Sequence, residues 1–265
     1  MILVLDALSP QRRRLILAAG GLALLLIMTV AVIAIVRVAA PPAEPVPQTP
    51  PGPVLLVPGY GGNINSLQPL ATALRSAGRT AVIVEPIGDG TGDLREQAEH
   101  LAEVAVQVRN DAGSASVDVV GYSAGGVVTR LWVRDNGGAG VARRILTLGS
   151  PHHGTSQAAL GAEFVGGCSA ACEQLIPDSD LLLRLNAGDE TPAGPLWATV
   201  RSTSDQVVTP AESAALSGAV NIVIQEVCPA SNAAHGDLPA NPVVLAALGS
   251  VLGVELPQAP TDIAC

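Results

Sequence analysis

Residues 117–126 read VDVVGYSAGG, an apolar run followed by a Gly-x-Ser-x-Gly turn. The run Val117–Val120 predicts a buried strand, and residues 124–134 have the apolar spacing of a helix. A sharp turn between a strand and a helix is typical of a nucleophile elbow, which lifts the hydroxyl of Ser123 to the end of the sheet at the positive end of a helix dipole. The flanking glycines carry no side chain because strand and helix nearly touch there. A chance glycine turn is the alternative, and the strand before and the helix after the motif favour the elbow.

Short apolar runs alternate with helical patterns on both sides of this motif, from residue 54 to the end of the chain. Several runs are apolar on both faces, which is typical of a parallel sheet covered by helices. The expected strands are 54–57, 80–87, 117–120, 143–148, 196–201 and 220–226. The expected helices are 67–77, 93–110, 124–134, 179–185 and 242–252. The alternation predicts a doubly wound α/β domain with a mostly parallel central sheet flanked by helices.

The composition excludes several classes of protein. The chain has 265 residues, with 14 basic and 23 acidic side chains, a formal net charge of −9, and 2% aromatic residues. Every basic residue is arginine. A nucleic-acid-binding protein needs a basic face to displace counterions and aromatic side chains to stack on bases, so we expect no nucleic-acid partner. The hydrophobic content of 48% excludes a chain that is disordered throughout.

The N-terminal region has the pattern of a membrane segment. The stretch Leu15–Val36 contains no charge, and at about 1.5 Å per helical residue it is long enough to cross a hydrocarbon layer of about 30 Å. Three arginines (12–14) precede it and only Arg37 follows, which predicts a cytoplasmic N-terminus. The alternative is a cleaved signal peptide. The length of the stretch favours an uncleaved anchor, and both alternatives place the rest of the chain outside the cytoplasm.

These patterns predict four parts of the chain. Residues 1–14 form a cytoplasmic tail, residues 15–38 a single-pass transmembrane signal-anchor helix, residues 39–53 a proline-rich linker, and residues 54–265 the globular domain. Because proline fixes φ and removes amide donors, we expect the linker to be an extended, fairly stiff spacer, or else a disordered tether. The expected location is the cell membrane with the domain outside, or the secreted fraction if the segment is cleaved.

All four cysteines lie in the globular domain, at 168, 172, 228 and 265. An even number of cysteines outside the cytoplasm indicates disulfide bonds, for which three connectivities are possible. We favour Cys168–Cys172, which closes a small loop, and Cys228–Cys265, which attaches the C-terminus. A metal site is the weaker alternative, because the cysteines are not clustered with histidines.

A serine hydroxyl needs a base and an acid that orients the base. After a nucleophile elbow the expected chain order is serine, acid, histidine. Asp205 follows the expected strand 196–201, where a carboxylate reaches the carboxyl edge of the sheet, whereas the competing carboxylates precede that strand. The competitors are Asp178, Asp180 and Asp189.

His235 lies in a loop between the last expected strand and the last expected helix, so its order and position fit the base. His152 and His153 come too early in the chain for that role. His100 lies on the exposed side of an amphipathic helix.

The transition state of acyl transfer also needs donors for its oxyanion. Residues 54–62 read VLLVPGYGG, a strand that runs into a glycine-rich turn. The backbone N–H groups of Tyr60 and Ala124 are the candidate donors. A phosphate-binding turn is the alternative, but the spacing fits no phosphate motif and the chain has no lysine to meet a phosphate.

Together these motifs resemble the small bacterial lipase/esterase group of the α/β-hydrolase superfamily, and in particular the class-2-type lipases of Gram-positive bacteria. The resemblance rests on the segments GYSAGG, VPGYGG, SPHHGT, SDQVV and AHGDL and covers most of residues 54–265. It implies an α/β-hydrolase fold, with Ser123 as nucleophile, Asp205 as acid, His235 as base, and Tyr60 and Ala124 as oxyanion donors. It also implies a pocket formed in part by the four residues Gly59, Tyr122, His152 and His153, with the two histidines ordering it by hydrogen bonds. One departure is Pro58, which stands where many members have histidine.

The resemblance implies a carboxylic-ester hydrolase of the triacylglycerol lipase or carboxylesterase type, which acts on lipid or small acyl esters through an acyl-enzyme. No metal or organic cofactor is expected. An acyltransferase or thioesterase of cell-envelope lipids and a non-catalytic surface binding module remain as alternatives. The chain has little room for a large lid, so we expect an open aliphatic cleft that favours short- to medium-chain esters. Apolar residues within 157–188 are the candidate walls, although they suit an ordinary core equally well: Phe164, Val165, Leu175, Ile176, Leu181, Leu182 and Leu183.

Overall fold

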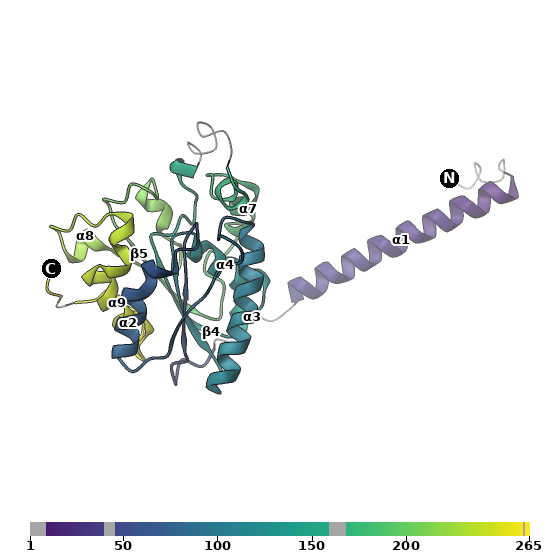
Figure 1. The fold of residues 1–265 in the computed structure, drawn as a ribbon. Helices are drawn as coiled ribbons and strands as arrows, with labels where there is room; N and C mark the ends of the chain where they lie inside the picture. Colours follow the sequence, from purple (N-terminus) through teal and green to yellow (C-terminus); the bar gives the residue numbers. More distant parts are fainter. Residues whose placement is uncertain (1–8, 40–45, 159–167, 262) are drawn as a thin grey trace. The chain divides into compact units, whose positions relative to one another are not determined.

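A computed structural model describes residues 9–39, 46–158, 168–261 and 263–265 (Figure 1). The chain divides into two compact units, Met1–Pro42 and Ala43–Cys265. In the first unit, helix α1 runs from Pro10 to Ala39. Counting only the described residues, no helix reaches the length and hydrophobicity required to span a membrane. The transmembrane helix predicted for residues 15–38 is therefore not confirmed.

The second unit is built on a six-stranded sheet in the order β2-β1-β3-β4-β5-β6. All neighbouring strands are parallel, so their carboxyl ends meet at one edge of the sheet. The strands are β1 (Val54–Val57), β2 (Ala81–Ile83), β3 (Val117–Tyr122), β4 (Ala142–Leu148), β5 (Leu196–Arg201) and β6 (Val220–Val223).

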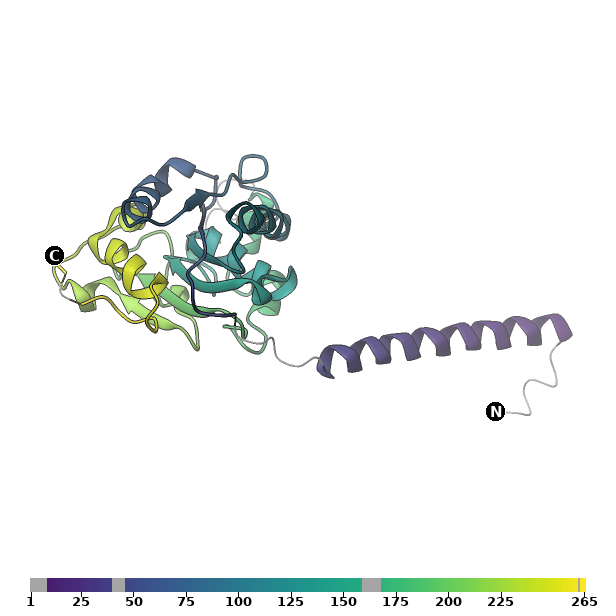
Figure 2. The ribbon, with the colours of Figure 1, turned by 90° about the horizontal axis from the view of Figure 1, so that it is seen from below.

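Helices cover both faces of this sheet (Figures 1 and 2). The α-helices are α2 (Gln68–Ser76), α3 (Leu94–Ala112), α4 (Ala124–Asp135), α6 (Ala170–Gln174), α7 (Asp180–Leu185), α8 (Ile224–Val227) and α9 (Pro242–Leu252). Short 3-10 helices are η2 (Ile64–Leu67), η3 (Gly138–Gly140), η4 (Ala211–Ala214) and η5 (His235–Ala240). The mostly parallel sheet between two helical layers confirms the predicted α/β architecture.

Strand β1 shows why both faces must be covered. Successive side chains of a strand point to opposite faces, and Val54 and Leu56 pack with α2 and α9, whereas Leu55 and Val57 pack with α3, α4 and α7. All four side chains are buried. Two hydrophobic cores, one on each face, thus hold the sheet in place.

Most expected elements differ by one or two residues from the predicted bounds, and two strands are clearly shorter. Strand β2 stops at Ile83, and the remainder of the predicted strand 80–87 forms a loop. Strand β6 stops at Val223, and the last part of the predicted strand 220–226 belongs to α8. Helix α3 begins after Asp93, whose side chain accepts a hydrogen bond from the Arg95 N–H, and ends at Gly113 in the left-handed conformation.

Both disulfides have the pairing that the sequence analysis favours. Cys168 is bonded to Cys172 across the start of α6. Cys228 is bonded to Cys265, so the last residue is held against the end of α8. Closing a loop removes conformations from the unfolded chain, and the loop between Cys228 and Cys265 is the longer one, with a sequence separation of 37.

The second half of the predicted spacer packs against the domain. From Val46, which is 4% exposed, the chain runs along the amino ends of β3 and β4. The Gln48 side chain accepts a hydrogen bond from Arg144 Nε at 3.1 Å, and the Gln48 carbonyl accepts one from Arg143 Nη1 at 3.0 Å. Proline composition predicts stiffness but does not reveal this contact, because the arginines that make it lie far away in the sequence.

A buried charge cluster organises this edge of the sheet. One carboxylate oxygen of Asp118 accepts hydrogen bonds from Arg79 at 2.6 Å and from Arg143 at 2.5 Å. The side chains of Asp118 and Arg143 are fully buried. Arg143 also donates to the carbonyls of Leu252 and Gly253 at the end of α9. Arginine suits this position because its planar guanidinium donates several hydrogen bonds at once.

We predict that Arg143→Leu lowers the free energy of unfolding by about 3–5 kcal/mol, because the variant removes one partner of a buried ion pair. Urea unfolding of the full chain, followed by the fluorescence of the buried Trp132 and Trp197, measures the change. The matched control is Arg184→Leu, which breaks an exposed ion pair with Asp180. The side chains of Arg184 and Asp180 are 70% and 89% exposed. The control is expected to change stability by less than about 0.5 kcal/mol. Equal effects of the two variants would contradict the structural role of the cluster.

Candidate active site

The backbone of Ser123 has a conformation that is rare for a residue with a side chain. Ser123 joins β3 to α4 with φ 54° and ψ −128°. A Cβ added at Gly121 would lie 2.7 Å from the Cα of Gly126, and one added at Gly125 would lie 2.5 Å from the carbonyl oxygen of Pro58. The glycines are therefore required by the close approach of strand, helix and turn. This packing holds the partly exposed Ser123 at the carboxyl end of the sheet.

Two loops bring Asp205 and His235 to the same end of the sheet. Asp205 follows β5, and His235 opens η5. His235 Nε2 lies 3.0 Å from Ser123 Oγ, and His235 Nδ1 lies 2.7 Å from Asp205 Oδ2. The three side chains thus form one chain of hydrogen bonds from hydroxyl to imidazole to carboxylate. Asp205 and His235 are 5% and 8% exposed.

The surroundings of Asp205 favour its ionised form. Burial alone would raise its pKa, but the hydrogen bond and charge of His235 and two backbone amides together lower the pKa below its ordinary value. The amides are those of Val207 and Val208, which donate to Asp205 Oδ1 at 2.8 and 2.9 Å. One carboxylate oxygen is therefore held by the backbone, and the other is free to orient the imidazole.

Tyr122 supports His235 from the side. The two rings stack with centroids 5.2 Å apart, and the Tyr122 hydroxyl donates a hydrogen bond to the His235 carbonyl at 3.1 Å. Burial and, to a lesser extent, the nearby carboxylates of Asp205 and Asp237 raise the pKa of Tyr122 to about 12. Tyr122 therefore stays neutral and holds the ring of His235 in place.

The structure reveals one site residue that sequence reasoning missed. Gly149 follows β4 with φ 51°, and a Cβ added there would lie 3.2 Å from both Asp205 Oδ2 and His235 Nδ1 and 2.5 Å from Leu238 Cδ1. Gly149 thus leaves space for the hydrogen bond between Asp205 and His235. The glycine after an apolar strand was visible in the sequence, but its neighbours come from two distant loops.

The two candidate oxyanion donors belong to segments that lie next to Ser123. Ala124 is the first residue of α4, so its amide has no acceptor within the helix. Tyr60 lies in a turn that is closed by a hydrogen bond from the Gly62 N–H to the Gly59 carbonyl at 3.0 Å. A Cβ added at Gly59 would lie 2.8 Å from Ser123 Cβ, so the turn runs directly beside the serine. In the described part of the chain, neither amide has a hydrogen-bond acceptor.

The other histidines have partners away from Ser123. His152 is fully buried, with Nε2 3.0 Å from Thr147 Oγ1. Burial, followed by the charges of Arg130 and His153, lowers the pKa of His152 well below its ordinary value, so the ring is neutral. His153 Nε2 lies 2.7 Å from Glu190, and His100 Nε2 lies 3.0 Å from the carbonyl of Glu85.

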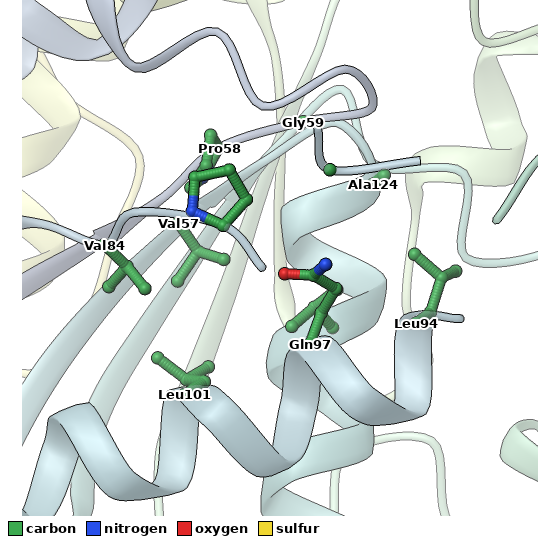
Figure 3. Close-up of a pocket in the computed structure, with 11 residues that line it drawn as sticks. Val57, Pro58, Gly59, Val84, Leu94, Gln97, Leu101 and Ala124 are labelled. Atoms are coloured by element: carbon green, nitrogen blue, oxygen red, sulfur yellow. The ribbon is translucent and has the colours of Figure 1, made fainter. Parts of the chain in front are cut away.

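Several of the candidate walls of an acyl pocket are ordinary core, which is the alternative that the sequence left open. Leu175, Leu181 and Leu182 belong to the hydrophobic core, Leu183 is 55% exposed, and Phe164 and Val165 lie outside the described residues. A small cavity of about 20 Å³ lies between the turn at Gly59 and helix α3 (Figure 3). Its lining is Val57, Pro58, Gly59, Val84, Pro86, Gly90, Leu94, Gln97, Leu101, Ala124 and Val128. This volume is close to that of one water molecule.

Solved structures of lipases share this architecture. Aspergillus fumigatus lipase B matches with a TM-score of 0.69 and 21% identity, over 80% of this chain and 54% of that one. The chain has the α/β-hydrolase fold. The mature form of the Bacillus licheniformis lipase BlEst2 matches with a TM-score of 0.60 and 18% identity, over 76% of this chain and 90% of that one. The chain thus spans about half the length of the Aspergillus lipase and most of the length of the Bacillus lipase.

The sequence of the chain also matches a family model. Residues 53–184, just under half of the chain, match the palmitoyl protein thioesterase family. No curated protein sequence matches the chain. The matched range contains the turn at Tyr60 and the elbow at Ser123 and ends before Asp205 and His235. The chain is thus similar in part of its sequence to a thioesterase family and in its fold to lipases.

We predict that Gly149→Ala slows the reaction of Ser123 with a fluorophosphonate by about 10- to 100-fold, because the added methyl group displaces the acid and the base from each other. The labelling rate of the purified protein measures the effect. Gly113→Ala is the matched control, since Gly113 has φ 58° and open space around the added carbon. The control is expected to lose about 1–2 kcal/mol of stability from backbone strain and to keep the labelling rate. Equal labelling rates of the Gly149 variant and the wild type would contradict the role given to Gly149.

Proposed function

We propose that the chain is a serine carboxylic-ester hydrolase that acts through Ser123, His235 and Asp205. The observation that carries the proposal is the position of His235, whose ring nitrogens lie 3.0 Å from Ser123 Oγ and 2.7 Å from Asp205 Oδ2. A base that contacts both the hydroxyl and an orienting carboxylate is the arrangement that activates a serine. The fold, which is that of lipases and esterases, supports the same reaction class.

In the first half of the reaction, Ser123 Oγ attacks the carbonyl carbon of the ester while His235 Nε2 takes the hydroxyl proton. The C–O bond of the ester then breaks, and His235 returns the proton to the leaving alcohol, which leaves an acyl-Ser123. In the second half, His235 takes a proton from water, the water oxygen attacks the acyl carbon, and the bond to Ser123 Oγ breaks. The acid is released and Ser123 regains its proton.

Asp205 and the two amides stabilise the charges that develop in these steps. The positive charge on His235 lies beside the carboxylate of Asp205, whose lowered pKa keeps it ionised. The negative charge on the substrate oxygen is stabilised by the N–H groups of Tyr60 and Ala124, neither of which has an acceptor among the residues that the structure describes. Among the described residues, no group of three metal-ligating side chains is arranged to hold a metal ion. All proton transfers in this scheme use the side chains of the chain itself.

A thioester is the second candidate substrate, and a specific observation favours it. Residues 53–184, which include Ser123, match the palmitoyl protein thioesterase family. The same acyl-enzyme forms from either substrate, with a thiol in place of the alcohol as the leaving group. An acyltransferase would also share the first half of the reaction and differ only in the acceptor of the acyl group.

We further propose that the segment 15–38 anchors the protein in the cell membrane, with the domain outside the cytoplasm. The proposal rests on the sequence, because Leu15–Val36 carries no charge and three arginines precede it. In this arrangement the two disulfides of the domain lie in an oxidising compartment, where such bonds persist.

We predict that Ser123→Ala lowers kcat/KM for p-nitrophenyl esters by about 10⁴-fold or more and abolishes fluorophosphonate labelling, since it removes the nucleophile. His100→Ala, a histidine variant away from the site, is the control and keeps the wild-type rate. Release of p-nitrophenol from esters and of thiol from acyl thioesters of matched chain length identifies the better substrate. A folded wild-type protein that is neither labelled nor active on either substrate would refute the proposed function.

For the anchor, we predict that the full chain stays in the membrane fraction after an alkaline carbonate wash and keeps its N-terminal peptide in mass spectrometry. A Leu24→Arg and Ile27→Arg double variant is expected to leave that fraction, because each arginine at the centre of a span disfavours insertion by about 2.5–3.5 kcal/mol. The matched control replaces both residues by alanine. Recovery of a wild-type protein that lacks residues 1–40 in the soluble fraction would identify a cleaved signal peptide instead.

A further inference from the structure

The turn that carries the amide of Tyr60 has few internal contacts of its own. Within the turn, the Gly62 N–H donates to the Gly59 carbonyl at 3.0 Å. Its second backbone link is a longer hydrogen bond of 3.3 Å, from the Gly61 N–H to the Gly90 carbonyl in the neighbouring loop. Gly59, Gly61 and Gly62 have no side chains that pack into the domain. The position of the Tyr60 amide therefore depends on what lies beneath and above the turn.

Beneath the turn, packing is incomplete. Figure 3 shows Pro58 and Gly59 above the small cavity, with Leu94, Gln97 and Leu101 of α3 below it. Because the side chains of α3 do not contact the turn across this cavity, part of the dispersion attraction that would hold the turn is missing. On this side, therefore, the turn lacks part of the packing that would fix the position of the Tyr60 amide.

Above the turn, a side-chain hydrogen bond attaches it to α6. The Tyr60 hydroxyl lies 3.0 Å from Ser169 Oγ. Ser169 precedes α6 and accepts a hydrogen bond from the Cys172 N–H, and the Cys168–Cys172 disulfide closes the same loop. Tyr60 is 50% exposed, so its ring is positioned by this bond rather than by burial.

Helix α6 is itself fixed to the body of the domain. The Ala171 N–H donates to the Thr91 carbonyl at 3.1 Å. The Gln174 side chain accepts a hydrogen bond from the Leu94 N–H at 2.8 Å, at the start of α3. Both bonds attach α6 to the region that precedes and begins α3. Ser169 is therefore a fixed point to which the turn can be tied.

We propose that the hydrogen bond between Tyr60 and Ser169 positions the oxyanion-hole amide of Tyr60, so that the two side chains are positioning residues for the reaction. The inference rests on the proposed function. The hydroxyls of Tyr60 and Ser169 take no part in proton transfer. The bond acts on the exposed side of the turn, opposite the incompletely packed side. It matters most when the negative charge develops on the substrate oxygen.

The expected consequence is a loss of turnover without a loss of substrate binding. An interaction that is stronger in the transition state than in the ground state changes kcat rather than KM. Removal of an oxyanion donor typically lowers the rate by about 10²–10³-fold. Release of a tether leaves the amide in place for part of the time, so we expect a smaller effect of about 3- to 10-fold, in line with one neutral hydrogen bond.

The test compares full-length variants that remove the bond from either side, Tyr60→Phe and Ser169→Ala, with the double variant. Tyr60→Phe keeps the backbone N–H and the ring. Each single variant is expected to lower kcat for a p-nitrophenyl ester about 3- to 10-fold with KM unchanged, and the double variant is expected to be no worse, because all three lack the same bond. Ser123 adds to the carbonyl of a trifluoromethyl ketone, and the product carries an oxyanion in the oxyanion hole. We expect the affinity of the variants for this inhibitor to fall by the same factor as kcat.

Two controls separate positioning from general stability. Ser169→Thr keeps a hydroxyl and is expected to retain kcat. Ser179→Ala removes the matching N-terminal cap of the neighbouring helix α7 and is also expected to retain kcat. Wild-type kcat and inhibitor affinity in both Tyr60→Phe and Ser169→Ala would overturn the proposal, and so would an equal loss of kcat in Ser179→Ala. A wild-type enzyme without ester or thioester hydrolysis would instead refute the proposed function.

Discussion

The close approach of three backbone segments around Ser123 is the constraint on which the site depends. Strand β3, helix α4 and the turn after β1 meet where a single added carbon at Gly121 or Gly125 would collide with neighbouring backbone. A backbone conformation such as that of Ser123, with φ 54°, is unfavourable by about 1–3 kcal/mol and persists only where the surroundings hold it. Two hydrophobic cores, one on each face of the sheet, supply that support. The exposed hydroxyl is thus a consequence of packing.

The sequence predicted the parts of this arrangement that depend on local pattern and on order along the chain. The elbow is a local motif, and an acid and a histidine after later strands must lie at the same edge once the strands are parallel. Asp205 and His235 do meet Ser123 there. The alternation of apolar runs and helical patterns predicted the sheet for the same reason, since strands that are apolar on both faces require helices on both sides.

What the sequence did not reveal are contacts between segments that no pattern connects. Helix α6 is too short to show a helical period, and the contact of Gly149 with Asp205 and His235 depends on two loops. The docking of residues 46–53 depends on arginines from β4. Strand ends were also misjudged, because apolar residues after Ile83 and Val223 suit a strand and a loop or helix equally well.

Strand β3 connects the two ends of the sheet. Near its start, the buried Asp118 is held by Arg79 and Arg143, and beyond its end Ser123 is held by the elbow. A one-residue slip of β3 would turn Asp118 away from its arginines and expose an unpaired charge to the hydrophobic core, which is strongly unfavourable. The buried carboxylate of Asp118 at one edge therefore disfavours this slip of β3. The same slip would also move the Ser123 hydroxyl at the other edge away from His235. Stability and reactivity are in this way linked through a single strand.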